Sequence, residues 1–341
     1  MLSGGGSVLR SFAPRRCAAS ILTRKIAVLP PIKTICTDFS CTYLTSPRVL
    51  LVFAVSSFIF AVSNPICATC RSAAHAFIPT RHIKLIAMSA LQKVALVTGA
   101  NRGIGFATAR RLGELGFKVL LGARDAKRGE EAVRTLRNDK LDVDLLLMKP
   151  TEHASVEAAV QKVEADYKRL DVLINNAALM DFDNKMFPLN IQRMREEFEI
   201  NFFATVDITN SFLPLMLRSS EAPRLVFVST PLGTHETVDR PQNKYAHPNL
   251  TAYKCTKTAV NMYAHNLAKY LEKYPEEAGG SAASAKVNCC YPGYVQTDMC
   301  FNSQEAHFTP YEGAETSVWL ATLPADGPTG GFYHRSEKLP W

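Results

Sequence analysis

A tyrosine and a lysine four residues apart, Tyr253 and Lys257, form the pair in this chain best suited to acid–base chemistry. Residues at this spacing lie on one face of a helix. A phenol has a pKa near 10 and exchanges its proton poorly at neutral pH, but a neighbouring ammonium group favours the phenolate. Lowering the pKa of the phenol by about 3 units corresponds to roughly 4 kcal/mol and would bring it close to its working pH. Ordinary helices often contain a tyrosine and a lysine at this spacing. The two residues alone are therefore also compatible with a surface pair that has no catalytic role.

A glycine-rich turn lies upstream of this pair, in the stretch VALVTGANRGIG at 94–105. A short apolar run ends at Gly99, and a helix-compatible segment, 106–115, follows Gly103 and Gly105. A strand, a tight turn and a helix start in this order are typical of a dinucleotide site, because helix N-terminal N–H groups attract phosphate and glycines let the backbone approach it. A simple turn between a strand and a helix is the alternative. The alternation of strands and helices that follows favours the dinucleotide site.

Two arginines near this turn indicate which dinucleotide is bound. NAD-binding proteins usually place an acid at the end of the second strand for the ribose 2′-hydroxyl, whereas arginine suits the 2′-phosphate of NADP. In the stretch VLLGARD the place of the acid is taken by Ala123 and Arg124 follows, while Arg102 lies in the glycine turn. Two solvated surface arginines are the alternative, but two cations at one predicted pocket favour NADP(H).

Alternating strands and helices must position these residues. Apolar runs predict strands at 94–97, 118–122, 143–147, 172–174, 225–228 and 286–289. Helices are predicted at 106–115, 127–138, 153–167, 191–217, 251–271 and 312–323. Continuously apolar strands that alternate with helices indicate a parallel sheet covered on both faces, with ligands beyond the carboxyl ends of the strands. We therefore expect an α/β fold: a single doubly wound Rossmann-type domain over 91–341, with a mostly parallel seven-stranded sheet and helices on both faces.

Taken together, the motifs resemble those of the short-chain dehydrogenase/reductase family. They are TGANRGIG, NNAA at 175–178, Asn201 in INFFATVDIT, a Ser-Thr pair after the fifth strand, YKCTK and PGYVQTDM, in the family's order and spacing. The resemblance covers about residues 91–341. The stretches NFFATVD, VNCCYPGYVQTDM, EGAETSVWLATLP and the terminal SEKLPW make it most similar to the NADPH-dependent carbonyl reductases.

This resemblance implies a role for each catalytic candidate. Tyr253 would protonate the carbonyl oxygen of the substrate, while Lys257 lowers the pKa of Tyr253 and holds the nicotinamide ribose. Thr230 would donate a hydrogen bond to the same oxygen, with Ser229 as the fallback donor, and Asn201 would anchor a water in the proton relay. Cofactor contacts are implied for Gly99, Asn101, Arg102, Gly103, Ile104, Gly105, Arg124, Asn175, Ala177, Tyr253, Lys257, Pro292, Gly293, Val295 and Thr297. No metal site is expected.

Three positions depart from the pattern of the family. Thr230 stands where a serine is usual, and its branched carbon restricts the rotamer. Lys149 replaces an acid that would contact the adenine amino group, and Ala178 replaces a glycine. Between Thr230 and Tyr253 lie 22 residues, more than the usual run. We expect this insertion to border the substrate pocket, and it leaves both a monomer and a dimer open.

The first 88 residues have the composition of a targeting or disordered extension. They contain ten Lys or Arg and one acid, whereas the remainder contains 29 basic and 30 acidic residues and gives no case for nucleic acid. The apolar segment 49–68 has a core of 14 residues, 49–62. As a helix this core would span about 21 Å, less than the hydrocarbon layer of roughly 30 Å. A cleaved signal-type region is therefore favoured over an anchor, and transient or weak membrane association through 49–68 stays open.

The extension also sets the expected location. We expect targeting to an organelle, through a two-part presequence of plastid type or a mitochondrial presequence. Translation from Met88 would instead give a cytoplasmic protein. Four of the nine cysteines, Cys255, Cys289, Cys290 and Cys300, lie in the domain, and their spacing does not suggest a disulfide framework, which favours a reducing compartment.

The expected activity is the NADPH-dependent reduction of a small-molecule carbonyl, a ketone, aldehyde or quinone, to an alcohol. Hydride transfer would be accompanied by proton donation from Tyr253. One alternative is a non-catalytic NADP(H)-binding regulatory protein, which the departures at Thr230 and Lys149 motivate. Another is an alcohol dehydrogenase that runs in the oxidative direction.

Overall fold

The computed structural model describes residues 92–236, 250–301 and 303–341. The predicted extension 1–88, with its apolar segment 49–68, lies outside the described residues, as does most of the insertion before Tyr253. What the sequence predicts for these two parts stays a prediction.

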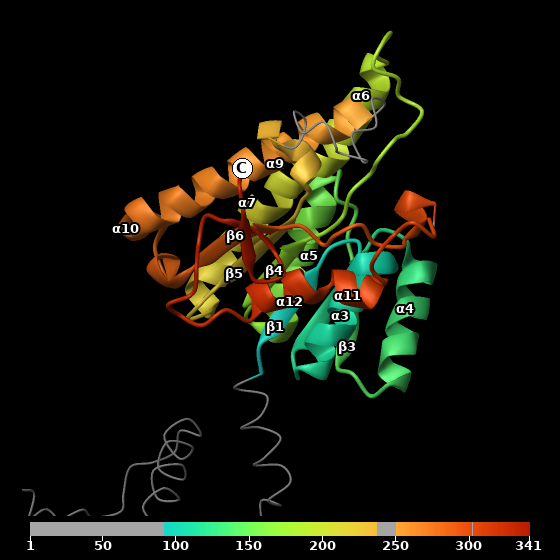
Figure 1. Cartoon of the computed structure of the whole chain (residues 1–341). Coiled ribbons are helices and arrows are strands. Elements are labelled where there is room, and N and C mark those ends of the chain that lie inside the picture. The colour runs from blue at the N-terminus through green and yellow to red at the C-terminus, as the bar shows by residue number, and fades with distance from the viewer. Residues whose placement is uncertain (1–91, 237–249, 302) are drawn as a thin grey trace, which may run out of the picture. The chain divides into compact units, whose positions relative to one another are not determined.

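One sheet of eight strands organises the described chain (Figure 1). The strands are β1 (Val94–Val97), β2 (Lys118–Ala123), β3 (Val143–Leu147), β4 (Val172–Asn175), β5 (Arg224–Val228), β6 (Lys286–Cys290), β7 (Phe332–His334) and β8 (Glu337–Leu339). Their order is β3-β2-β1-β4-β5-β6-β7-β8, and all neighbours are parallel except β7 and β8. The chain moves outward from β1 first to one edge and then to the other, so the predicted doubly wound α/β fold is confirmed.

The predicted number of seven strands is wrong by one. β7 and β8 are three residues long each and are joined by a tight turn in which Arg335 has a φ of +55°. Runs this short carry no readable periodicity, and the sequence of β8, Glu-Lys-Leu, is mostly polar. β8 pairs antiparallel to β7 and closes that edge of the sheet.

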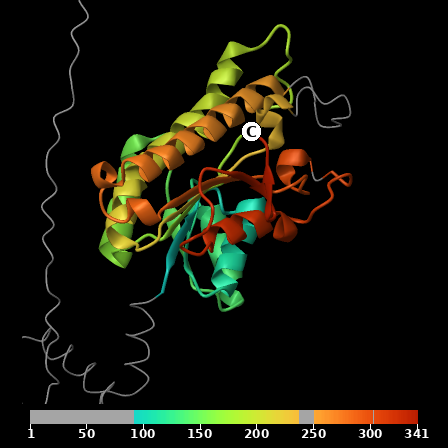
Figure 2. The ribbon, with the colours of Figure 1, turned by 60° about the vertical axis from the view of Figure 1, so that its left-hand side comes forward.

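Helices cover both faces of the sheet (Figures 1 and 2). The α-helices are α3 (Gly103–Glu114), α4 (Ala126–Asn138), α5 (His153–Tyr167), α6 (Ile191–Phe198), α7 (Ala204–Ser219), α9 (Thr251–Lys273), α10 (Pro275–Ala278), α11 (Pro310–Gly313) and α12 (Glu315–Ala321). A π-helix, η2 (Glu199–Phe203), joins α6 to α7. Short 3₁₀ helices are η3 (Pro231–Gly233), η5 (Ala282–Ser284) and η6 (Asp298–Cys300).

Two apolar cores lie on either side of the sheet. Buried residues of α5, α7 and α9 form one core and those of α3, α4 and α12 the other. The residues of β1 alternate between them, with Leu96 in the first and Val97 in the second. Burial on both faces explains why these strands read as continuous apolar runs.

The predicted helix 191–217 is interrupted. The chain from Ile191 to Ser219 runs as α6, η2 and α7. It is the one described helical run long and apolar enough to span a membrane, yet Ile208, Phe212 and Leu215 are buried in the core of the domain. The π-helix between its two α-helical parts carries Asn201, a predicted site residue.

Candidate active site

A cleft of about 480 Å³ opens at the carboxyl ends of the central strands. The glycine turn after β1, the ends of β2, β4 and β5, the helix α9 and the segment after β6 all contribute to its wall. Ligands of doubly wound sheets bind in this position, beyond the strand ends where the chain direction diverges. The elements predicted to meet at one site therefore do so.

The glycine turn has the conformation and the space that a close ligand needs. Gly99 and Gly103 have φ values of +62° and +57°, in the left-handed region that favours glycine. A Cβ on Gly105 would lie 2.6 Å from the carbonyl oxygen of Gly99 and 2.5 Å from Nδ2 of Asn176. With α3 beginning at Gly103, its free N–H groups lie at this turn, so the residues present fit a phosphate group.

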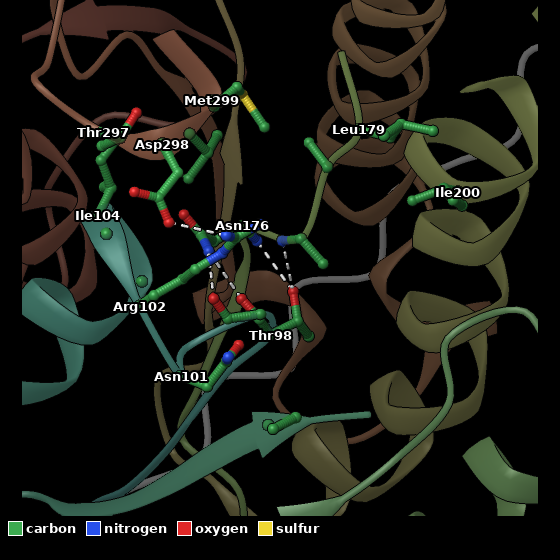
Figure 3. Close-up of a pocket in the computed structure, with 18 of the residues that line it drawn as sticks. Thr98, Asn101, Arg102, Ile104, Asn176, Leu179, Ile200, Thr297, Asp298 and Met299 are labelled. Carbon is green, nitrogen blue, oxygen red and sulfur yellow. Dashed lines mark hydrogen bonds and ion pairs between the residues drawn. The ribbon is translucent and has the colours of Figure 1, made fainter. Parts of the chain in front are cut away.

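Side chains tie the turn to the neighbouring strand end (Figure 3). The hydroxyl of Thr98 accepts hydrogen bonds from the backbone N–H groups of Asn176 and Ala177, both at 3.0 Å. Nδ2 of Asn176 donates to the carbonyl of Thr98 at 2.8 Å. This network fixes the two loops that form the floor of the cleft. Thr98 and Asn176 were not among the predicted site residues, although each directly follows an apolar strand.

Most of the predicted cofactor contacts line the cleft. They are Gly99, Asn101, Arg102, Gly103, Ile104, Gly105, Arg124, Ala177, Tyr253, Lys257, Pro292 and Thr297. Ala178, the position that departs from the family pattern, lies in the wall as well.

Three predicted contacts are placed elsewhere. The side chain of Asn175 donates from Nδ2 to Oγ1 of Thr209 in α7 at 3.0 Å, because alternation along β4 leaves Asn176 to face the cleft. Gly293 packs against the ring of Phe308, which a Cβ would approach to 2.4 Å. Val295 is buried, pairs with Phe308 in an isolated bridge and does not line the cleft.

Three arginines stand at the outer part of the cleft, one more than predicted. Arg102 and Arg124 are joined by Arg128, on the first turn of α4. Asp125 caps this helix by accepting the N–H of Arg128 at 2.9 Å. Nη1 of Arg102 lies 2.8 Å from Oδ2 of Asp298, and Figure 3 shows the two side chains meeting across the cleft. Sequence reasoning missed Arg128. Its spacing of four residues from Arg124, with Asp125 as a helix cap between them, could have placed it near the same cleft.

Lys149 does not line the cleft, although its neighbours Met148 and Pro150 do. Its Nζ lies 3.0 Å from Oε1 of Glu152, on the exposed side of the loop. The departure from the family pattern at this position therefore places no lysine amine in the cleft wall.

Tyr253 and Lys257 lie on the first turns of α9 and are both buried in the wall of the cleft. Nζ of Lys257 donates a hydrogen bond to the carbonyl of Val228, the last residue of β5, at 2.8 Å. The same nitrogen is 5.7 Å from the centroid of the Tyr253 ring. The predicted helical pair therefore faces the predicted dinucleotide cleft.

The predicted lowering of the phenol's pKa is not found in this structure. Burial raises the pKa of Tyr253, and nearby Cys300 and Glu197 add to the rise. Burial also lowers the pKa of Lys257 to about 8. In both cases the main cause is removal from water, which penalises the charged form of each group. Both groups therefore favour their neutral forms more than they would in water.

The two candidate hydroxyl donors differ in position. Ser229 lies in the cleft wall, and its hydroxyl donates to Oδ1 of Asn261 in α9 at 2.5 Å. Thr230 does not line the cleft, because it caps η3 and its hydroxyl accepts the N–H of Leu232 at 3.3 Å. The residue predicted as the fallback is thus the one that faces the cleft.

Asn201 lies behind the cleft wall rather than in it. Its Oδ1 accepts the N–H of Leu179 at 2.7 Å, and its Nδ2 donates to the carbonyl of Leu179 at 2.8 Å. Nδ2 also donates to Oγ1 of Thr256 in α9 at 3.1 Å. The side chain thereby holds Leu179, which lines the cleft, against the helix of Tyr253. Its predicted part in a water relay stays a prediction.

Fold and site together define a dinucleotide-dependent oxidoreductase of the doubly wound class. Residues 93–307 match the family described as short chain dehydrogenase. The chain therefore belongs to the short-chain dehydrogenase/reductase family, as its motifs predicted.

Individual relatives are similar over nearly their whole length. "Carbonyl reductase [NADPH] 1" of Mus musculus is 35% identical over 287 residues, which cover 74% of this chain and 100% of the relative. Among solved structures, salutaridine reductase from Papaver somniferum is 26% identical with a TM-score of 0.58, over 71% of this chain and 99% of the other. Menthone neomenthol reductase from Mentha piperita is 25% identical with a TM-score of 0.57, over 72% of this chain and 100% of the other.

Proposed function

We propose that this protein reduces the carbonyl group of a ketone, aldehyde or quinone to an alcohol, with NADPH as the reductant and Tyr253 as the proton donor. The chain is an NADP-dependent oxidoreductase, and its similarity to the mouse NADPH carbonyl reductase supports the reaction class. The observation that carries the proposal is the placement of Tyr253 and Lys257 in the wall of the cleft that the glycine turn opens.

The residues of the cleft fit NADP(H) along its length. The glycine turn and the start of α3 would hold the pyrophosphate. Arg124 and Arg128, at the end of β2 and the start of α4, would bind the 2′-phosphate, for which planar guanidinium groups are well suited. Lys257, beside Tyr253, would hold the nicotinamide ribose. When bound, the nicotinamide supplies the hydride.

Burial raises the pKa of Tyr253, so its phenol holds its proton at neutral pH but is a weaker acid than it would be in water. Proton transfer to a carbonyl oxygen therefore requires that the bound cofactor and Lys257 stabilise the phenolate that forms. Ser229, whose hydroxyl lies in the cleft wall, would become a second donor to that oxygen when its single proton turns from Oδ1 of Asn261 toward the substrate.

The test is oxidation of NADPH by the purified protein with a panel of ketones, aldehydes and quinones. We expect turnover of at least one compound, and replacement of Tyr253 by Phe to abolish it while NADPH still binds. Proton donation by a positioned group typically contributes about 10²–10⁴-fold to rate, so the loss should be of that order.

A control on the same helix is Tyr263→Phe. The hydroxyl of Tyr263 donates to Oδ1 of Asn210 at 3.0 Å, outside the cleft, so turnover should be unchanged. Folded protein that binds NADPH but reduces no compound on the panel would overturn the proposal. Full turnover in Tyr253→Phe would remove Tyr253 from its role.

A further inference from the structure

A carboxyl group, that of Glu197, is buried beside the catalytic pair without an assigned role. The helix α6 carries several charged residues, of which Arg195 and Glu196 are exposed. Glu197 is only 1% exposed. Because burying a carboxyl group costs free energy unless it is hydrogen-bonded, its contacts should explain its position.

One oxygen of this carboxyl group holds the loop that follows β4. Oε1 of Glu197 accepts the backbone N–H of Asp181 at 3.0 Å. Four residues further on, Asn201 binds both backbone groups of Leu179. The two side chains thus clamp residues 179–181 to the run from α6 to η2. Leu179 lines the cleft, so this clamp sets one wall of it.

The other oxygen, Oε2, is buried and has no hydrogen-bond partner among the described residues. The charged and titratable groups that face Glu197 are few. The carboxylate of Asp181 lies nearby and is paired with Arg193 at 2.9 Å. Tyr253 of α9 is close enough for the charge of Glu197 to raise the pKa of the phenol. None of these groups supplies a cation directly to Glu197. Its ionised form is therefore poorly stabilised while the clamp is closed.

We propose that Glu197 is a positioning residue for carbonyl reduction, which holds the 179–181 wall of the cleft closed when neutral and releases it when ionised. Opening the clamp lets water reach Oε2, which stabilises the carboxylate. The closed form disfavours the ionised carboxylate. By linkage, ionisation of Glu197 must therefore shift the equilibrium toward the open form by the same free energy. Substrate affinity should consequently fall as the pH rises from 5 toward 7.

The electrostatics give the pH range. Burial raises the pKa of Glu197 to about 7, from an ordinary value near 4.5. The closed form binds this proton more tightly than the open form does. The free-energy advantage of the closed form over the open form is therefore greatest below the ordinary pKa of a glutamate. It declines as the pH rises and becomes constant once Glu197 is ionised in the closed form as well. Between pH 5 and pH 7 the ratio of open to closed protein should rise by up to about tenfold for each pH unit.

The experiment compares the full-length protein with Glu197→Gln, which keeps an acceptor for Asp181 but cannot ionise. Glu199→Gln, on an exposed acid two residues away, is the matched control. Amide hydrogen exchange of peptide 179–183, corrected for intrinsic rates, is measured at pH 5 and pH 7. Wild type and Glu199→Gln should lose protection by about tenfold or more between these values, and Glu197→Gln should lose none.

The second measurement is steady-state kinetics of the same variants, with menadione as the quinone substrate and NADPH as the reductant. The KM for menadione should rise over this pH range in wild type and Glu199→Gln but stay flat in Glu197→Gln, while the pH dependence of kcat is shared by all three. Glu197→Met, which fills the site without accepting a hydrogen bond, should lose protection of 179–183 at both pH values.

Parallel pH profiles of wild type and Glu197→Gln in hydrogen exchange would overturn this inference. The kinetic arm rests on the proposed function, whereas the exchange arm does not need turnover. Absence of menadione reduction would therefore count against the proposed substrate range, and the exchange result would still decide the role of Glu197.

Discussion

The three arginines at the outer cleft differ in the partners that they already have. Arg102 is engaged by Asp298, whereas Arg124 and Arg128 form no ion pair among the described residues. A guanidinium group without a carboxylate partner can bind a phosphate without first giving up another anion. At the residue scale we therefore assign cofactor selectivity to Arg124 and Arg128 rather than to Arg102.

Replacing Arg128 by Ala should weaken NADPH binding and leave NADH binding unchanged, because NADH lacks the 2′-phosphate. A charged hydrogen bond is worth about 1.5–3 kcal/mol, so the Kd for NADPH should rise about 10- to 100-fold. The measurement is a titration of both cofactors by protein fluorescence. Arg134→Ala, on an exposed position of the same helix outside the cleft, should change neither Kd. Equal weakening of both cofactors would show a structural effect instead.

At the scale of elements, the segment between β6 and α12 forms the outer wall of the cleft. Its residues Thr297, Asp298 and Pro310 line the cleft. Tyr311 anchors this segment to α3, because its hydroxyl donates to Glu114 at 2.8 Å and Nη1 of Arg111 donates to its carbonyl at 3.0 Å. The pair of Arg102 and Asp298 is a second, exposed connection between the same two elements. The contacts of Tyr311 with α3 do not involve the pair of Arg102 and Asp298.

Replacing Asp298 by Asn should release Arg102 and tighten NADPH binding. Exposed ion pairs contribute about 0.2–1 kcal/mol, so the Kd for NADPH should fall by no more than about fivefold, with no change for NADH. The same cofactor titration measures this, and Glu305→Gln in the same segment is the control. Weaker binding of both cofactors in Asp298→Asn would mean that the pair holds the cleft wall rather than competing with phosphate.

At the scale of the whole molecule, charge and composition divide the chain. The basic excess lies in residues 1–88, and the remainder is close to neutral. The first described strand, β1, begins at Val94. We propose that the extension carries a targeting function and is removed from the working enzyme.

The mature protein should begin after the apolar segment 49–68 and before Val94. N-terminal sequencing of the protein from its native source measures this directly. Alkaline extraction of native membranes should leave the protein in the soluble fraction, because a segment of this length is short for a membrane anchor. A mature chain that retains 49–62 and resists alkaline extraction would contradict the prediction.

The sequence by itself determined the order of the strands β1 to β6 and of the long helices between them, the glycine turn, the helical Tyr–Lys pair and the family. These follow from local periodicity, from glycine's access to positive φ and from motif spacing, all of which are properties of short stretches. The preference for NADP(H) that we propose was also suggested by the sequence, through the arginine at the end of the second strand.

Only the tertiary structure decided which of two adjacent residues faces the cleft and how burial shifts the pKa of the site residues. Whether Asn175 or Asn176 enters the wall depends on the pleat of β4, and the choice between Ser229 and Thr230 depends on the turn that η3 makes. The pKa of Tyr253 depends on the water excluded by segments far apart in the chain, and spacing along the sequence carries no information about that exclusion. For the same reason, an acid on a largely charged helix, Glu197, gave no sign in the sequence that it would be buried.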